Sequence, residues 1–303
     1  MKIFLAFARV LAFALLCIGA RTVNAHDADA NSAASLRAKY DGLQNQLSHN
    51  QFQRPLRLES GETPDSVTGD IYARIDYPFA TVRAGLTNPG DWRDILILHV
   101  NTKYCRASPG SSGAVLNVSI GRKYDEPLEQ AYRVDFAYRV ASQSASYLQV
   151  RLNADAGPFG THDYRILLEA VPLESGRTFI HFSYSFSYGL AGRLALQVYL
   201  ATIGRNKVGF AAAGTGSDGE PLYIGRIRGL VERNTMRYYL AIDAFLGAAS
   251  APPQARLEQR LRGWFAATER YPRQLHEMEQ DEYLDMKHKE VLRQQSERQA
   301  PPA

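Results

Sequence analysis

Histidine and cysteine are the residues of this chain from which chemistry would first be expected, but their spacing gives little support for it. The seven histidines form no H-x-x-x-H or H-E-x-x-H pair and no spaced Cys/His set, so the sequence predicts no metal site. His181, flanked by aromatic residues, alone has the setting of a catalytic histidine; a hydrogen-bonded strand histidine is the competing interpretation. Cys105 lies in a strand-like stretch and is interpreted as a buried apolar residue rather than a nucleophile.

A glycine-rich segment at 214–219 (GTGSDG) matches the G-x-G-x-x-G pattern of dinucleotide-binding sites. Such a site needs a strand before the glycines and a helix after them, because the phosphates meet the helix N-terminus. The residues that follow, 220–224 (EPLYI), have the character of an extended segment. We therefore interpret these glycines as a loop, a hairpin tip or a mobile lid, and expect no cofactor.

Polar residues interrupt the apolar stripe of the expected helix 226–246. A buried amide at Asn234 needs hydrogen-bond partners, which are either a neighbouring tyrosine or the polar head of a ligand. Arg226, Arg233 and Arg237 lie on the same helix. They are expected to face solvent and nearby acids, with an anionic head group as the alternative.

The element that organises these residues is the segment 177–188 (RTFIHFSYSFSY), in which large aromatic and small polar residues alternate strictly. Alternation at a period of two predicts a strand with two unlike faces. Further strands are expected over 67–77, 100–107, 114–124, 131–141, 147–154 and 164–173, and the short turns between the later ones favour antiparallel neighbours. Helices are expected over 32–47, 79–87, around Trp92 with Asp91 as the cap, and over 190–203, 226–246, 255–268 and 270–295, the last of them solvated.

The first 25 residues have the features of a secretory signal peptide, with an uncleaved anchor as the alternative. A positive start precedes an apolar run over 10–20, which is too short to span a membrane, and small residues follow at 23–25. Its removal leaves basic and acidic residues nearly balanced, so nucleic acid is not an expected partner. The expected location is periplasmic or secreted, and with one remaining cysteine the mature chain must depend on its core for stability.

The order of the predicted elements resembles the helix-grip fold of the START-like (SRPBCC, Bet v-like) superfamily. The likeness is carried by 69–79 (GDIYARIDYPF), a strand that ends at a proline and leads into a helix, and by 88–92 (NPGDW). The predicted class is α+β, a curved antiparallel sheet gripping a long C-terminal helix, with extra C-terminal helices. The predicted units are 1–25 (signal peptide), 26–66 (N-terminal helix and extended segment), 67–249 (helix-grip domain) and 254–303 (helical extension). The insertion at 189–225 and the extension depart from the superfamily's pattern.

The resemblance implies a cavity between sheet and long helix. Together with the expected signal peptide, it predicts an exported, non-catalytic binding or carrier protein for a lipid-like apolar ligand. The expected ligand-binding residues are Trp92, Phe136, Tyr138, Tyr184, Phe186, Asn234 and Tyr238. Two alternatives remain open. One is a START-like enzyme, cyclase- or hydrolase-like, that acts on an apolar substrate. The other is an envelope interaction protein with a filled core, whose partner binds residues 254–298.

Overall fold

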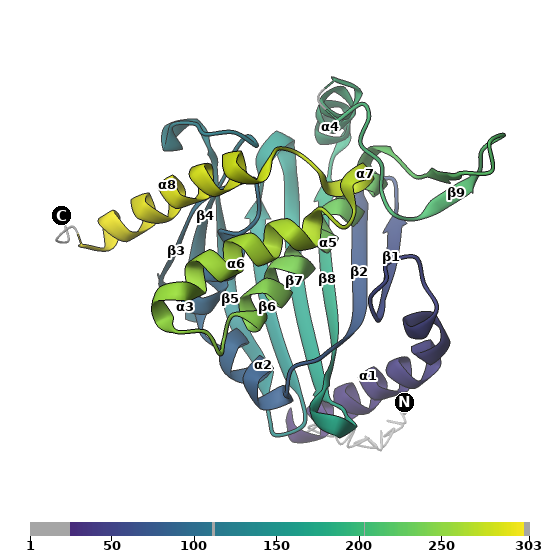
Figure 1. Ribbon diagram of the computed structural model, residues 1–303, viewed down its shortest axis with the longest axis vertical. Helices are drawn as coiled ribbons and strands as arrows, with labels where there is room; N and C mark the ends of the chain where they lie inside the picture. The colour runs from purple at the N-terminus through teal and green to yellow at the C-terminus, as the bar shows by residue number, and fades with distance from the viewer. Residues whose placement is uncertain (1–24, 111–112, 203, 300–303) are drawn as a thin grey trace, which may run out of the picture.

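One curved antiparallel sheet of eight strands forms the body of the molecule (Figure 1). The computed structural model describes residues 25–110, 113–202 and 204–299, so the predicted signal peptide lies outside them except for its last residue. The strand order is β1-β2-β8-β7-β6-β5-β4-β3. The bounds are β1 Leu56–Glu62, β2 Ser66–Ile75, β3 Thr102–Gly110, β4 Gly113–Ile120, β5 Tyr132–Gln143, β6 Leu148–Ala156, β7 Thr161–Pro172 and β8 Thr178–Tyr188. The organising strand β8 lies between β2 and β7 rather than at an edge.

The predicted strand with unlike faces is confirmed in β8. Phe182, Tyr184 and Phe186 are buried toward the helices, whereas Ser183 and Ser185 between them are partly exposed on the other face. The neighbouring strands alternate in the same register, and β2 pairs with β8 over its whole length. The concave face is therefore continuously apolar, which is what a sheet needs to cover a helix.

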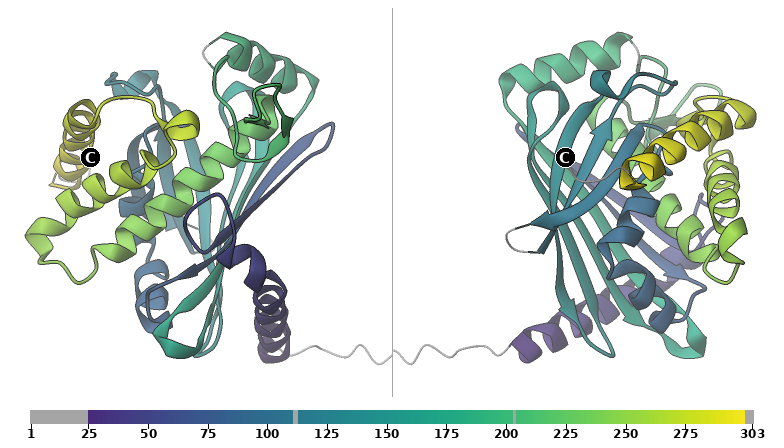
Figure 2. Two further views of the ribbon diagram at one scale, coloured as in Figure 1. Left: turned by 45° about the vertical axis from the view of Figure 1, so that its right-hand side comes forward. Right: turned by 90° about the vertical axis from the view of Figure 1, so that its left-hand side faces the viewer.

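Three helices lie on the concave face: α2 (Phe79–Leu86), α3 (Pro89–Leu96) and the long α5 (Arg226–Gly247), which crosses the sheet diagonally (Figure 2). The predicted cap of α3 was wrong by three residues. Asn88 is the cap and its side chain accepts the Gly90 N–H, because Pro89 takes the first helical position, where its missing N–H costs nothing. The α+β helix-grip arrangement is confirmed.

Gly69 of β2 allows α5 to approach the sheet closely. A side chain there would meet Thr235, because a Cβ atom built on Gly69 lies 2.3 Å from the Thr235 hydroxyl oxygen. Further along, α5 buries Met236, Leu240 and Ile242 completely or nearly so. The helix is thus closely packed after residue 238, and open space borders it between residues 230 and 238.

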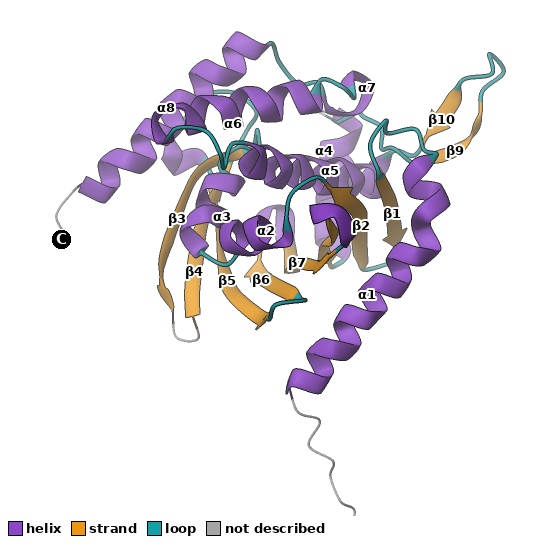
Figure 3. Cartoon of the chain, turned by 60° about the horizontal axis from the view of Figure 1, so that its bottom comes forward, coloured by secondary structure: helices purple, strands orange, loops and turns teal. Residues whose placement is uncertain are grey.

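The convex face is covered at one end by α1 (Ala25–Ser48), which lies outside the sheet in Figure 3. The helix begins earlier than the predicted 32–47. Leu36, Leu43 and Leu47 are buried in one cluster with Phe179, and the Tyr40 ring is tilted against the Phe179 ring with the centroids 5.0 Å apart. The outer face of β8 is therefore a second, smaller apolar contact rather than plain solvent-facing surface.

The insertion contains α4 (Leu190–Thr202) and a hairpin of β9 (Ala212–Thr215) and β10 (Pro221–Tyr223), which projects from the body in Figure 3. The glycine-rich segment forms the hairpin tip, and no helix follows it directly, so the interpretation as a hairpin tip is confirmed. Buried Glu232 of α5 accepts the backbone N–H groups of Phe210 and Ala211, which fastens the base of the insertion to the long helix.

The C-terminal extension folds back over the domain as α6 (Pro253–Thr268), α7 (Pro272–Leu275) and α8 (Gln280–Gln299) (Figure 1). The single helix predicted over 270–295 was wrong, since the helix breaks at 276–279. The short 3-10 helices are Leu128–Gln130, Pro158–Gly160 and Glu174–Gly176. Within the described residues, none of the helices combines the length and the apolar character needed to cross a bilayer.

The prediction that the last helix is solvated was also wrong, because α8 buries charged side chains against edge strand β3. The Lys103 ammonium bonds Glu290, the Tyr124 carbonyl and the Met286 sulfur, at 2.9–3.1 Å. The Lys287 ammonium bonds Glu290 and the carbonyls of His99 and Thr102, at 2.7–2.9 Å. We call Lys103, Lys287 and Glu290 the strap cluster. All three side chains are at most 1% exposed.

Candidate ligand-binding site

A cavity of about 790 Å³ lies between the concave face of the sheet and residues 230–238 of α5. Its walls come from β7, β8 and α5, from the β4–β5 loop, from the start of β3 and from α4 of the insertion. Ligand pockets for small molecules typically have about 300–1,000 Å³. The space is therefore large enough for a small molecule, and the filled-core interpretation does not describe this domain.

The sheet side of the cavity is an aromatic wall. The rings of Tyr164 and Phe186 stack with their centroids 5.2 Å apart. The ring of Tyr184 on β8 is tilted against that of Tyr238 on α5, with the centroids 5.4 Å apart. Aromatic pairs in such offset and tilted arrangements are favourable and rigid. This wall is suited to the flat or aliphatic part of a ligand.

The structure brings four of the seven predicted ligand-binding residues together, since Tyr184, Phe186, Asn234 and Tyr238 all line the cavity. Trp92, Phe136 and Tyr138 are not among the lining residues. The reason is that the sheet closes onto α2 and α3 at that end.

Each of those three residues has a partner in the packed core. The Trp92 indole N–H and the Tyr138 hydroxyl both donate to the Leu86 carbonyl, at 2.8 and 3.2 Å. Phe136 lies edge-on to Tyr164 with centroids 6.3 Å apart. Phe136 thus supports the aromatic wall from behind.

His99 places an unpartnered donor at the cavity. Its Nδ1 accepts the Asn101 N–H, so in the neutral ring the proton is on Nε2. Burial, followed by the charges of Arg237 and Lys287, holds the pKa of His99 well below its usual value. Nε2 makes no hydrogen bond of normal geometry with any described residue, although the Asn234 amide lies near it. A buried N–H without a partner is costly, and a ligand acceptor would satisfy it.

One end of the cavity is strongly basic. The five basic side chains among the lining residues are Arg122, Lys123, Lys207, Arg233 and Arg237, against one acidic lining residue, Glu126. Glu277, directly behind them, accepts from Lys123 at 2.7 Å, from Lys207 at 3.1 Å and from Arg237 at 2.5 Å. We call Lys123, Lys207, Arg233, Arg237 and Glu277 the cavity cluster.

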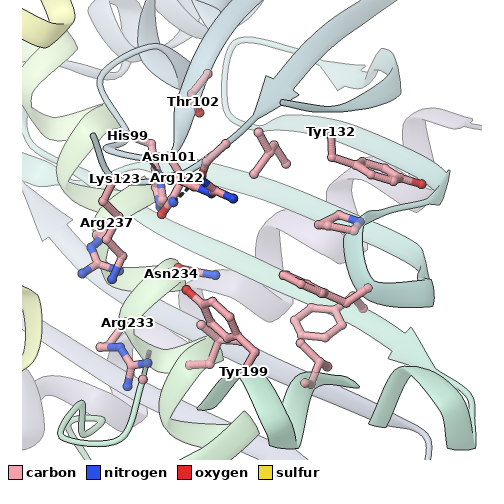
Figure 4. A pocket seen from close by; sticks show the side chains of 18 of the residues that line it. His99, Asn101, Thr102, Arg122, Lys123, Tyr132, Tyr199, Arg233, Asn234 and Arg237 are labelled. Atoms are coloured by element: carbon pink, nitrogen blue, oxygen red, sulfur yellow. Dashed lines mark hydrogen bonds between the residues drawn. The ribbon is translucent and has the colours of Figure 1, made fainter. Parts of the chain in front are cut away.

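In Figure 4, Lys123, Arg233 and Arg237 gather at one side of the cavity, while Tyr132 lies at the opposite side and Asn234 between them. The site therefore has a basic end and an aromatic remainder.

Burial and mutual repulsion shift the pKa values of the cavity cluster. Burial, then the charge of Arg237, lowers the pKa of Lys123 to about 8 and that of Arg233 to about 10. Burial alone raises the pKa of Glu277, but Arg237 and Lys123 outweigh it and hold the pKa at about 2. One carboxylate thus compensates several cations only in part.

The candidate catalytic histidine lies away from the cavity, on the convex face. The two ring nitrogens of His181 bond the carboxylates of Asp70 and Glu169, at 2.9 and 2.8 Å. The ring stacks on that of Tyr72 with the centroids 4.4 Å apart. Burial lowers its pKa, but the two carboxylates outweigh this and raise it to about 9, so the ring is a charged structural bridge. Cys105 is fully buried, as predicted. Among the described residues no group of histidine, cysteine and acidic side chains is placed to hold a metal ion.

The sequence did not reveal His99, Lys123 and Lys207 as cavity residues. It led us to expect Arg233 and Arg237 to face solvent and nearby acids. These residues lie in the segment after α3, in a strand–strand loop, in the insertion and on α5. No periodic pattern joins such positions. The one available signal was the row of arginines at 226, 233 and 237, of which the last two line the cavity.

No family model and no curated protein matches the chain. Among solved structures, a truncated norcoclaurine synthase from Thalictrum flavum is similar at 14% identity and a TM-score of 0.32, with 48% of this chain and 90% of that one covered. Ara h 8.0201 is similar at 14% identity and a TM-score of 0.32, with 46% and 91% covered.

A protein of unknown function from Enterococcus faecalis is similar over 78% of this chain and 92% of its own, at 9% identity and a TM-score of 0.30. Values this low carry no information about a ligand or an activity.

Proposed function

We propose that this protein is an exported, non-catalytic binding or carrier protein that holds a lipid-like small molecule in the cavity between sheet and α5. The observation that carries the proposal is the cavity itself, about 790 Å³ with an aromatic wall in an otherwise closely packed domain. Burying apolar ligand surface there contributes about 25 cal/mol per Å². The Asn234 amide and the His99 N–H are placed to orient a polar group of the ligand.

Native mass spectrometry of the purified mature protein, followed by extraction, tests the proposal. Leu230 and Leu257 are both half-buried leucines packed against the core, but only Leu230 lines the cavity. We expect Leu230→Trp, which fills the cavity, to remove the bound mass, and Leu257→Trp on α6 to retain it. Retention of the mass in both variants, or no bound lipid-like mass and no uptake of an added one, contradicts the proposal.

The second candidate, an enzyme acting on an apolar substrate, is favoured by one observation. Lys123 lines the cavity with a pKa lowered to about 8 by burial and by Arg237, as a basic catalytic group requires. Its ammonium is nevertheless bonded to Glu277 at 2.7 Å, which makes it a poor base. Chemical conversion of an extracted ligand by the protein, lost in Lys123→Met, would favour the enzyme.

The third candidate is an envelope protein that binds a partner through residues 254–298. Tyr283, Lys287 and Glu290 of this segment are buried against the domain, and among its described residues Leu292 is the exposed large apolar side chain. A partner would have to use the outer faces of α6 and α8. This candidate is compatible with ligand binding and ranks below it.

A further inference from the structure

The cavity has a charge asymmetry that an uncharged lipid would not require. Five basic side chains line it, and the two carboxylates at this end are already engaged. Glu126 accepts the backbone N–H of Arg122, and Glu277 is shared among three cations. The other buried acid close by, Glu232, accepts two backbone N–H groups and the Ser60 hydroxyl. These three carboxylates stand against five basic side chains, so this end of the cavity keeps an excess of positive charge.

The two arginines of this end keep unused hydrogen-bond donors. Arg237 is 2% exposed, and its Nε has no hydrogen-bond partner among the described residues. Arg233 is 3% exposed, and one bond is observed for its side chain, from Nη1 to the Val208 carbonyl at 3.1 Å. A guanidinium has five N–H donors in a fixed planar fork that matches carboxylate and phosphate oxygens. His99 adds the unpartnered Nε2 donor at the same cavity.

We propose that the ligand is an amphipathic anion, whose carboxylate or phosphate head binds Arg233, Arg237 and Lys123 while its apolar chain lies along Tyr164 and Phe186. This inference rests on the proposed binding function and adds the class of ligand. The aromatic wall and the basic end are parts of one cavity, so a single molecule contacts both. An anionic head supplies the negative charge that the cavity cluster lacks, in surroundings where charge-assisted hydrogen bonds are strong.

The test compares three probes with the same ten-carbon chain: decanoate, decanol and decyltrimethylammonium. Isothermal titration below their micelle concentrations gives the affinity of each for the mature protein. We expect decanoate to bind about tenfold to a hundredfold more tightly than decanol, since one or two charge-assisted hydrogen bonds are gained, and the cation not to bind. Decyl phosphate in a parallel arm separates a phosphate from a carboxylate preference.

Arg233→Met is the diagnostic variant, because it removes a donor fork but keeps the volume and the helix propensity. We expect it to lower decanoate affinity about tenfold and to leave decanol affinity unchanged. The matched control is Arg228→Met on the same helix, where the guanidinium bonds the Ser60 hydroxyl and does not line the cavity. Circular dichroism and thermal unfolding confirm that both variants fold.

The outcomes separate this inference from the proposed function. Equal affinity for decanoate and decanol, or an unchanged difference in Arg233→Met, overturns the anionic head and leaves apolar binding standing. Failure of all three probes to bind overturns both. Tight binding of tail-less acetate or inorganic phosphate overturns the amphipathic ligand, because the basic end would then be a site for small anions alone.

Discussion

The strap cluster is fully buried and the cavity cluster is partly buried, and the two clusters differ in how completely their hydrogen-bond donors are used. In the strap cluster each lysine ammonium has three acceptors, which equals its number of N–H groups. In the cavity cluster Arg237 keeps an unpaired Nε, and the Arg233 side chain has one observed bond. In the strap cluster the donors are used up by contacts within the protein, whereas the cavity cluster keeps unused donors beside open space, which supports the anionic ligand that we propose.

The clusters are also neighbours that share backbone. The β4–β5 loop offers the Tyr124 carbonyl to Lys103 and, one residue earlier, places Lys123 beside Glu277. His99 likewise offers its carbonyl to Lys287 and its ring to the cavity. The complete cluster therefore positions part of the incomplete one, and α8 supports the ligand site without lining it.

The largest expected effect comes from breaking the complete cluster with Glu290→Gln. Two buried ammonium groups then lose their carboxylate, and we expect the free energy of unfolding to fall by about 3–5 kcal/mol. Urea denaturation measures it. The control is Asp285→Asn, exposed on the same helix, for which the change should stay within about 0.5 kcal/mol. A loss below about 1 kcal/mol for Glu290→Gln would show that the strap cluster does not hold α8 in place.

Acid should weaken the cavity cluster through Glu277. Its pKa falls from 4.5 in the unfolded chain to about 2 in the folded one, so the stabilisation is complete above pH about 4.5 and is lost as the pH falls toward 2. Between about pH 6 and about pH 3 this group should lose about 2 kcal/mol. Unfolding of the wild type and of Glu277→Gln at both pH values isolates the contribution. An equal pH dependence in the two proteins would contradict it.

The smallest effect, and one of opposite sign, is expected for Arg233→Met without ligand. Burial and Arg237 lower the pKa of Arg233, which means that folding disfavours its charge. After the loss of one bond to the Val208 carbonyl is counted, we expect the free energy of unfolding to rise by about 1 kcal/mol. Thermal unfolding measures it alongside the ligand titrations. A clear destabilisation would place Arg233 with the structural cations of the strap cluster.

Most of the fold was predictable because apolar residues recur at regular spacing in its strands and helices. The alternation in 177–188 and the apolar stripe of 226–246 define a sheet face and the helix that it grips, and both were confirmed. The cap of α3 and the burial of α8 were predicted wrongly. In α8 the charges lie three and four residues apart, and the Lys287–Glu290 pair has the same spacing as a solvent-exposed pair on a helix surface.

Apart from Asn234, the predicted residues that line the cavity all belong to its aromatic side. Tyr184 and Phe186 belong to the alternating face of a strand, which a sequence pattern reveals. Lys123, Lys207 and His99 come from three loops or element ends whose meeting depends on tertiary structure. The local sequence around each residue contains no signal that the three segments meet at one cavity.

The contact between α8 and β3 has a consequence for the order in which the molecule can be completed. The Cys105 N–H of this edge strand donates to the Gln294 side chain, a residue 189 positions later. Until the end of the chain has been synthesised, the start of β3 remains an open strand edge with unpaired backbone groups, and long-range closures of this kind are slow. Late completion of this sheet edge is compatible with the export that we propose for the chain.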